Sequence, residues 1–186
     1  MADSARPTIR ININRAPVMT LWAAVVAERL GYDRETALTL GKAVAGLNAV
    51  SKGRRLGLVD DPEAAPSRKR ASPTPRRARE TRVELLGRSV PAVRTPRGLR
   101  AVAKGSPVSP GGVDRYLVEK FGPALPAARA AMEALAAAYD PERLAGEAYA
   151  LYERFRPDVP AGARGWGARG ALDLARLRAL APGGDE

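Results

Sequence analysis

The stretch T-L-W-A-A-V-V-A-E-R-L-G-Y-D-R-E-T-A-L-T-L-G-K, residues 20–42, predicts two consecutive helices joined by a tight turn. We expect the first helix to begin near Thr20, a residue type that caps helix N-termini, and to end at Gly31, because glycine readily adopts the left-handed conformation found there. Asp33 supplies a side-chain acceptor that caps the second helix. The apolar side chains of the first helix share one face: Trp22, Val25, Val26 and Leu30.

The second helix is expected to run to about residue 51 and to end at Gly53. Its apolar stripe consists of Leu40, Val44, Leu47 and Val50. Three small residues recur every four positions on another face: Gly41, Ala45 and Ala49. That face would let a neighbouring backbone approach closely, and the neighbour could belong to this chain or to a partner protein.

Within residues 23–42, small residues stand at two places where the helices must pass close together, with Ala27 in fifth position and Gly31 in ninth. Apolar residues occupy the packing positions around them: Val26, Leu30, Tyr32 and Leu40. This segment resembles the helix-turn-helix of DNA-binding regulators. The resemblance implies that four side chains of the second helix project toward the major groove: Arg34, Glu35, Thr39 and Lys42. Any two packed helices joined by a glycine share the same spacing.

Two stretches carry strand patterns. T-I-R-I-N-I-N-R, residues 8–15, alternates isoleucine with polar residues and predicts a short half-buried strand that Pro17 ends. V-E-L-L-G-R-S-V-P-A-V-R, residues 83–94, predicts a β-hairpin that turns at its central G-R pair, and Pro91 would restrict the second arm to a sheet edge. The following T-P-R-G-L-R-A-V-A-K, residues 95–104, is expected to form a short helix or a turn.

The remaining sequence predicts further helices. Ser109 followed by Pro110 is a favourable helix start, and Asp140 is placed to cap another helix. Helices are therefore expected at about 110–121, 124–139, 141–156 and 171–181. The predicted fold class is mainly α, with a helical N-terminal module and a helical C-terminal module that includes a small β-hairpin, joined by a basic flexible linker. The predicted boundaries are 1–59, 60–82 and 83–186.

The net charge of +11 is concentrated in one part of the chain. Residues 52–104 hold fifteen basic and five acidic side chains, whereas residues 1–51 carry a net charge of +2 and residues 105–186 a net charge of −1. A local excess of this kind indicates a polyanionic partner. Of the 31 basic residues 26 are arginine, so the codon bias of a GC-rich genome is an alternative source of part of the basicity.

The linker, residues 60–82, combines prolines and arginines without a periodic apolar set, so it is predicted to lack a core of its own. Its candidate phosphate-binding residues are Arg68, Lys69, Arg70, Arg76, Arg77 and Arg79. Ser72 and Thr74 precede prolines, and a phosphate on either would reduce the positive charge. The alternative is a solvated spacer. Just before the linker, Lys52, Arg54 and Arg55 could bind phosphate or complement the helix dipole.

R-G-W-G-A-R-G, residues 164–170, contains a G-x-G-x-x-G pattern. A dinucleotide site also needs a preceding strand within a βαβ unit, and here a proline-broken loop precedes the pattern. Two interpretations stay open. In one, Arg164 and Arg169 contact phosphate while Trp166 stacks on a base; in the other, Trp166 packs into the core and the glycines supply the turn.

The sequence contains no cysteine and no histidine, which removes the usual general base, the thiolate nucleophile and the commonest metal ligands. We therefore expect no enzyme activity, no cofactor and no metal, and a soluble cytoplasmic protein without a membrane-spanning segment, associated with the nucleoid if it binds DNA. The leading hypothesis is a nucleic-acid-binding protein, with DNA favoured, of a regulatory or nucleoid-associated kind. The alternative is a non-catalytic helical interaction or structural module that binds a second copy or a partner protein through helical faces.

Overall fold

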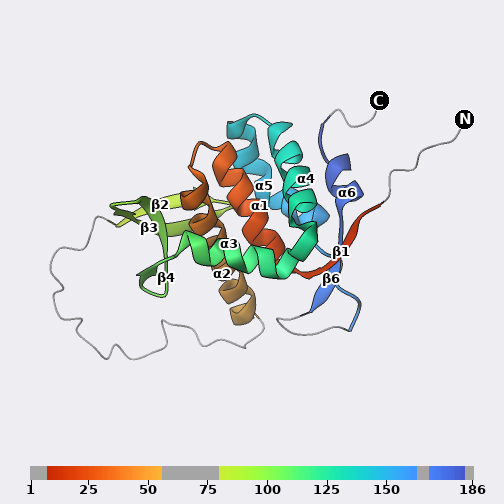
Figure 1. The fold of residues 1–186 in the computed structure, drawn as a ribbon, viewed down its shortest axis with the longest axis horizontal. Coiled ribbons are helices and arrows are strands. Elements are labelled where there is room, and N and C mark those ends of the chain that lie inside the picture. Colours follow the sequence, from red (N-terminus) through yellow and green to blue (C-terminus); the bar gives the residue numbers. More distant parts are fainter. Residues whose placement is uncertain (1–7, 56–79, 163–167, 183–186) are drawn as a thin grey trace, which may run out of the picture.

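The computed structural model describes residues 8–55, 80–162 and 168–182 (Figure 1). Its first part comprises β1 (Arg10–Asn14), α1 (Arg15–Arg29) and α2 (Arg34–Arg55). The second part begins with four strands: β2 (Glu80–Leu85), β3 (Arg88–Thr95), β4 (Gly98–Ala103) and β5 (Ser106–Pro107). It continues with α3 (Pro110–Phe121), the short 3-10 turn η1 (Gly122–Ala124), α4 (Leu125–Ala137), α5 (Pro141–Phe155), β6 (Arg169–Asp173) and α6 (Leu174–Ala179). We call the helices α1–α6 the helical body.

The strand content corrects the predicted fold class. Of the described residues 58% are helical and 23% are in strands, which form two antiparallel sheets. One sheet has four strands in the order β2-β3-β4-β5, and the other pairs β1 with β6. The prediction of a mainly α fold with one small hairpin is therefore wrong. The two sheets lie on opposite sides of the helical body (Figure 1).

Residues 95–104 form a turn and a strand, where a helix or turn was expected. Gly98 has a φ of +113°, and the Thr95 hydroxyl accepts a hydrogen bond from Arg97 N and donates one to Gly98 O, so the chain reverses and β4 pairs with β3. Strand β3 is therefore internal, and the prediction that Pro91 confines it to an edge is wrong. Pro91 is tolerated because it pairs only with Arg82 of β2, before the β3–β4 pairing begins.

Strand β6 occupies the first part of the segment that was expected to be helical. Its residues pair with β1, with Ile11 opposite Leu172 and Ile13 opposite Gly170, and Asp173 then caps α6. A Cβ at Gly170 would lie 2.6 Å from Asp158 O, so the close approach of Asp158 to β6, where it bridges to Ala171, requires glycine at this position. This strand was missed because its pairing partner lies far away in the sequence.

Helix α1 begins five residues earlier than predicted, at Arg15. Thr20 is not the N-cap: its buried hydroxyl donates to Ala16 O within the helix. Pro17 lies in the first turn of α1. Backbone N–H groups of a first turn make no hydrogen bond within the helix, so a proline, which lacks the N–H, is tolerated there. The predicted caps Asp33, Ser109 and Asp140 are confirmed, since each accepts a hydrogen bond from a backbone N–H of the first turn.

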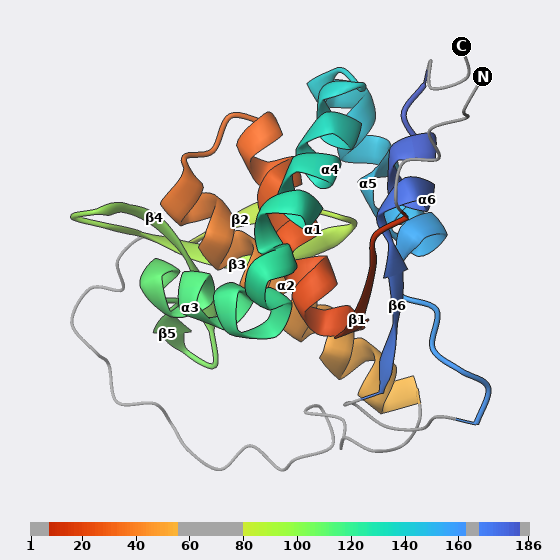
Figure 2. The same cartoon turned by 45° about the vertical axis from the view of Figure 1, so that its right-hand side comes forward.

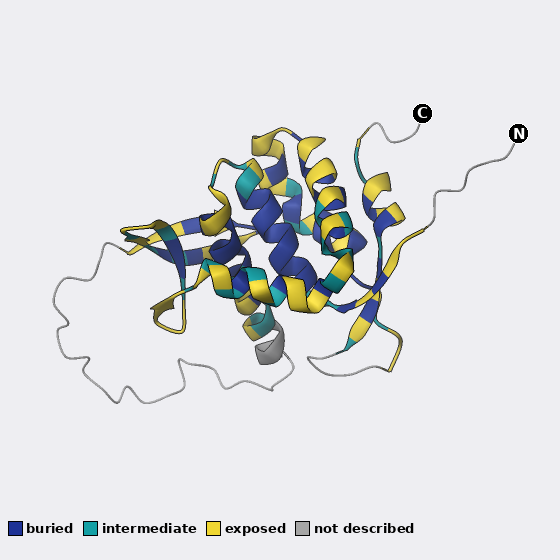
Figure 3. Ribbon diagram, in the orientation of Figure 1, coloured by how far each residue is buried: buried dark blue, intermediate teal, exposed yellow. Residues whose placement is uncertain are grey.

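Helix α1 is the centre of a single hydrophobic core, to which the described residues on both sides of the 60–82 segment contribute. Every residue from 17 to 27 is buried (Figure 3). The Trp22 indole N–H donates to Ala148 O at 2.8 Å, and its ring meets Phe155 edge-on with centroids 5.3 Å apart. Helices α2, α3, α4 and α5 pack around α1, and α6 packs against α4, as Figures 1 and 2 show from two directions.

Helix α2 crosses α1 at its small-residue face. A Cβ at Gly41 would lie 2.9 Å from Ala24 N, so only glycine permits this approach. The close approach that the small residues predicted therefore exists, and at Gly41 the neighbour is α1 of the same chain.

Candidate nucleic-acid interface

The predicted helix pair is present, with Gly31 at a φ of +106° between α1 and α2. The side chains predicted to face the major groove are engaged within the chain. Arg34 forms an ion pair with Asp114 of α3 at 3.3 Å. Whether the pair acts as a helix-turn-helix stays a prediction, but its second helix already packs against β4 and α3.

Thr39 is fully buried, which corrects its assignment as a nucleic-acid contact. Its hydroxyl donates to Thr36 O and accepts a hydrogen bond from Ala101 N of β4 at 3.0 Å. The short β5 pairs with β4 only at Val102 and Ala103. Thr39 of α2 therefore provides the hydrogen-bond acceptor for the Ala101 N–H of β4, next to the residues where the short β4–β5 pairing begins.

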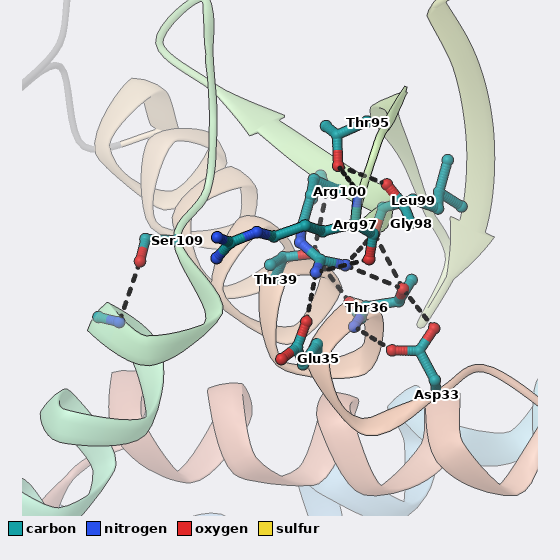
Figure 4. Close-up of polar contacts among 12 residues, drawn as sticks. Asp33, Glu35, Thr36, Thr39, Thr95, Arg97, Gly98, Leu99, Arg100 and Ser109 are labelled. Carbon is teal, nitrogen blue, oxygen red and sulfur yellow. Dashed lines mark hydrogen bonds and ion pairs between the residues drawn. The ribbon is translucent and has the colours of Figure 1, made fainter.

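Thr36 makes a second connection between α2 and β4. Its Oγ1 lies 2.7 Å from Asp33 Oδ2, to which it donates its one proton, and 2.9 Å from Leu99 O. The hydroxyl and the backbone N–H of Thr36 both donate to Asp33 and hold the pKa of that carboxyl below its ordinary value. The N-terminal turn of α2 is therefore fixed to the sheet by polar contacts (Figure 4).

Arg100 is buried at the same junction, although its residue type gave no reason to expect this. Its guanidinium donates to Leu99 O at 2.9 Å and to Arg97 O at 3.0 Å, and it forms an ion pair with Glu35 (Figure 4). Glu35, expected to face DNA or to favour the helix dipole, thus neutralises a buried arginine.

Lys42 covers an aromatic ring of the neighbouring helix. Its Nζ lies 3.5 Å from the ring centroid of Tyr116, a cation–π contact. Partial burial lowers the pKa of Lys42, and the positive charge of Lys120 lowers it further. Lys42 therefore stabilises the α2–α3 contact and is only partly exposed.

The structure describes only some of the other predicted contacts. Lys52, Arg54 and Arg55 lie in the last turn of α2, but their side chains are outside the described part of the structure. Arg169 is exposed at the start of β6. The remaining candidates lie outside the described residues: Arg68, Lys69, Arg70, Arg76, Arg77, Arg79, Arg164 and Trp166. The two interpretations of Trp166 therefore stay open.

The structure adds a set of exposed bases that the sequence did not single out. They belong to the four-stranded sheet and its turns: Arg82, Arg94, Arg97 and Lys104. We call them the basic sheet surface. Within residues 80–162 and the other described ranges, none of the four forms an ion pair with a carboxylate. The excess of basic residues in 52–104 pointed to this region, but the sequence does not tell which of these side chains are exposed.

The helical body pairs many of its arginines with acids. Arg129 Nη2 lies 2.7 Å from both carboxylate oxygens of Glu28, and its Nε lies 2.7 Å from Glu133. Other exposed arginines of the body form ion pairs as well, namely Arg143 with Glu147 and Arg176 with Asp158. Three further exposed arginines of the body, Arg115, Arg154 and Arg178, form no ion pair among the described residues, so positive charge is only partly neutralised there.

A groove of about 330 Å³ lies between the C-terminal part of α2 and the β2–β3 hairpin. Its lining includes Leu47 and Val50, which are 36% and 41% exposed, and Arg88, whose guanidinium donates to Asn48 Oδ1 at 2.7 Å. Among the residues that the structure describes, no three potential metal-ligating side chains come together.

Comparison with known proteins gives no match to a protein-family model, to a curated protein or to a solved structure. No helix in the described ranges has both the length and the apolar character required to cross a membrane.

Proposed function

We propose that the protein binds nucleic acid, with DNA as the favoured partner, in a regulatory or nucleoid-associated role. One observation carries the proposal: the basic sheet surface presents exposed bases without described carboxylate partners, inside a segment with fifteen basic and five acidic residues. A local excess of exposed cations without carboxylate partners attracts a polyanion. Phosphate contacts are thus the main source of affinity.

Base recognition has a smaller part in this proposal. Thr39 is buried, Arg34 is paired with Asp114, and Lys42 lies over Tyr116. Side chains committed to intramolecular contacts would have to leave them before reading a base. The protein is therefore expected to bind many sequences with similar affinity.

The test is fluorescence anisotropy of the full chain with labelled duplex DNA, single-stranded DNA and RNA over a salt series. Each phosphate contact contributes about 0.9 to the slope of log K against log salt for a duplex, so several contacts give a steep decline. Absence of binding to all three nucleic acids at low salt would overturn the proposal.

Two variants locate the contacts. The first replaces the basic side chains of residues 60–82 with glutamine, and the second is Arg34→Ala combined with Lys42→Ala. We expect the first to reduce the salt slope, because it removes charge from the basic segment, and the second to change it little. A larger loss in the second variant would favour the helix-turn-helix interpretation.

A second candidate function is protein–protein interaction, because Leu47 and Val50 are exposed beside the groove on α2. Exposed apolar side chains that line a groove are typical of interaction sites. Light scattering tests this candidate: a dimer that Leu47→Ser combined with Val50→Ser dissociates would support it, whereas a monomer at all concentrations would count against self-association.

A further inference from the structure

We infer that the tip of the β3–β4 hairpin, residues 94–98, is the part of the sheet that contacts the DNA duplex, with Arg94 and Arg97 against its phosphates. The inference rests on the proposed function and adds to it a specific surface and a preference for duplex over single strand.

Among the described residues, the tip extends beyond the neighbouring strands. Strand β2 pairs with β3 from Leu85 to Glu80, which lies opposite Val93, and β5 pairs with β4 at Val102 and Ala103. Beyond these pairs the described chain continues with Arg94 opposite Leu99 and Thr95 opposite Gly98. Within the part of the chain that the structure describes, the tip is thus a two-stranded ribbon, a shape that the major groove admits. Figure 2 shows it reaching away from the helical body.

The ribbon is held rigid from inside the protein. Thr95 closes the turn through its bonds with Arg97 N and Gly98 O, and Arg100 donates to Arg97 O from its buried position. Glu35 anchors Arg100 to α2. A surface held in one conformation loses less conformational entropy when it binds, which favours affinity.

The charges of the tip point outward. Arg94 and Arg97 are exposed, and in Figure 4 the Arg97 side chain extends away from the Arg100 network. Two carboxylates belong to this network: Glu35 is paired with Arg100, and Asp33 accepts hydrogen bonds from Thr36. The tip is therefore electropositive, with its guanidinium groups available to phosphate oxygens.

The composition of the basic segment, residues 52–109, favours binding of a duplex over binding of a single strand. Surfaces that hold single-stranded nucleic acid commonly stack bases on aromatic side chains, and residues 52–109 contain no Phe, Tyr or Trp. Phosphate contacts alone favour the partner with the higher charge density. Because a duplex carries two phosphates per base step, it should bind more tightly than its single strand.

The experiment compares three full-length variants by anisotropy with a labelled duplex and its single strand. The test variant is Arg94→Ala with Arg97→Ala, and the matched control removes two exposed arginines of α5 and α6, Arg154→Ala with Arg178→Ala. The third, Arg94→Lys with Arg97→Lys, keeps the charge. Circular dichroism melts check that all three fold.

We expect the test variant to lose about 2 from the salt slope for duplex and roughly tenfold or more in affinity at moderate salt. The control should lose much less, the lysine variant should recover most of the slope, and the wild-type protein should prefer duplex. A test variant that binds like the control, or tighter binding of the single strand, overturns the inference while leaving the proposed function standing. Failure of the wild-type protein to bind either form overturns both.

Discussion

The helical body and the four-stranded sheet treat their basic residues differently. In the body, Arg129 contacts Glu28 and Glu133. In the sheet, the buried Arg100 has a carboxylate partner within the chain, whereas the exposed Arg94 and Arg97 have none among the described residues.

The two regions are expected to differ in what they contribute: the helical body to stability and the sheet to binding. The body contains the large buried side chains around α1, and the sheet contributes mainly smaller ones such as Val90, Ala92 and Ala101. We therefore expect substitutions in the body to change the free energy of unfolding and substitutions on the basic sheet surface to change binding. Four predictions test this division.

The largest expected effect is that of Trp22→Ala. The indole is fully buried, meets Phe155 edge-on and donates to Ala148 O, so its removal leaves a cavity and removes that hydrogen bond. The free energy of unfolding should fall by about 3–5 kcal/mol in urea denaturation. The matched control is Val118→Ala on the exposed side of α3, which should stay within about 0.5 kcal/mol of the wild-type value. Equal effects of the two changes would contradict the assignment of the core to α1.

A smaller effect is expected where α2 crosses α1. Gly41→Ala places a Cβ 2.9 Å from Ala24 N and should cost about 1–3 kcal/mol through overpacking. Gly46→Ala in the same helix meets no atom within 4 Å and should stabilise the protein by about 0.5–1 kcal/mol. Opposite signs in thermal melts are the expected result. Stabilisation by both substitutions would show that the two helices do not approach as described.

The third prediction compares a paired and an unpaired arginine. Arg129→Ala leaves Glu28 without its partner in a partly buried place, so the free energy of unfolding should fall by about 1–2 kcal/mol. Arg97→Ala removes an exposed side chain and should change stability by less than about 0.5 kcal/mol. The division between body and sheet fails if Arg97→Ala destabilises the protein as much as Arg129→Ala.

The helices could be predicted because their signals are local. Ser109, Asp33 and Asp140 stand directly before the helices that they cap, and each is found in that role. Strands β4 and β6 were missed because what makes them strands is pairing: Ala101 lies opposite Ala92, and Leu172 opposite the distant Ile11.

The candidate site, like the strands, could be predicted only in part from the local sequence. The position of the charge in residues 52–104 could be read directly from the sequence. Which bases are exposed depends on folding: Arg100 is buried against Glu35, while Arg97, three residues earlier, points outward. Thr39 looked available on a helix face, but β4 covers it. No local pattern distinguishes these cases, because each depends on a partner brought close by tertiary structure.

The smallest effect at neutral pH is expected for Tyr152→Phe. The Tyr152 hydroxyl makes only a long bond to Arg15 O, at 3.4 Å, so its loss should cost less than about 1 kcal/mol at pH 7. Burial raises the pKa of Tyr152 to about 12, whereas the unfolded chain loses this proton near pH 10. Its contribution to stability is thus complete below pH 10 and is lost as the pH rises toward 12. Over that interval the wild-type protein should lose up to about 1.4 kcal/mol per pH unit more than the variant, measured by urea denaturation. If the free energy of unfolding changed with pH in the same way for both proteins, the Tyr152 hydroxyl would be in contact with solvent and not buried.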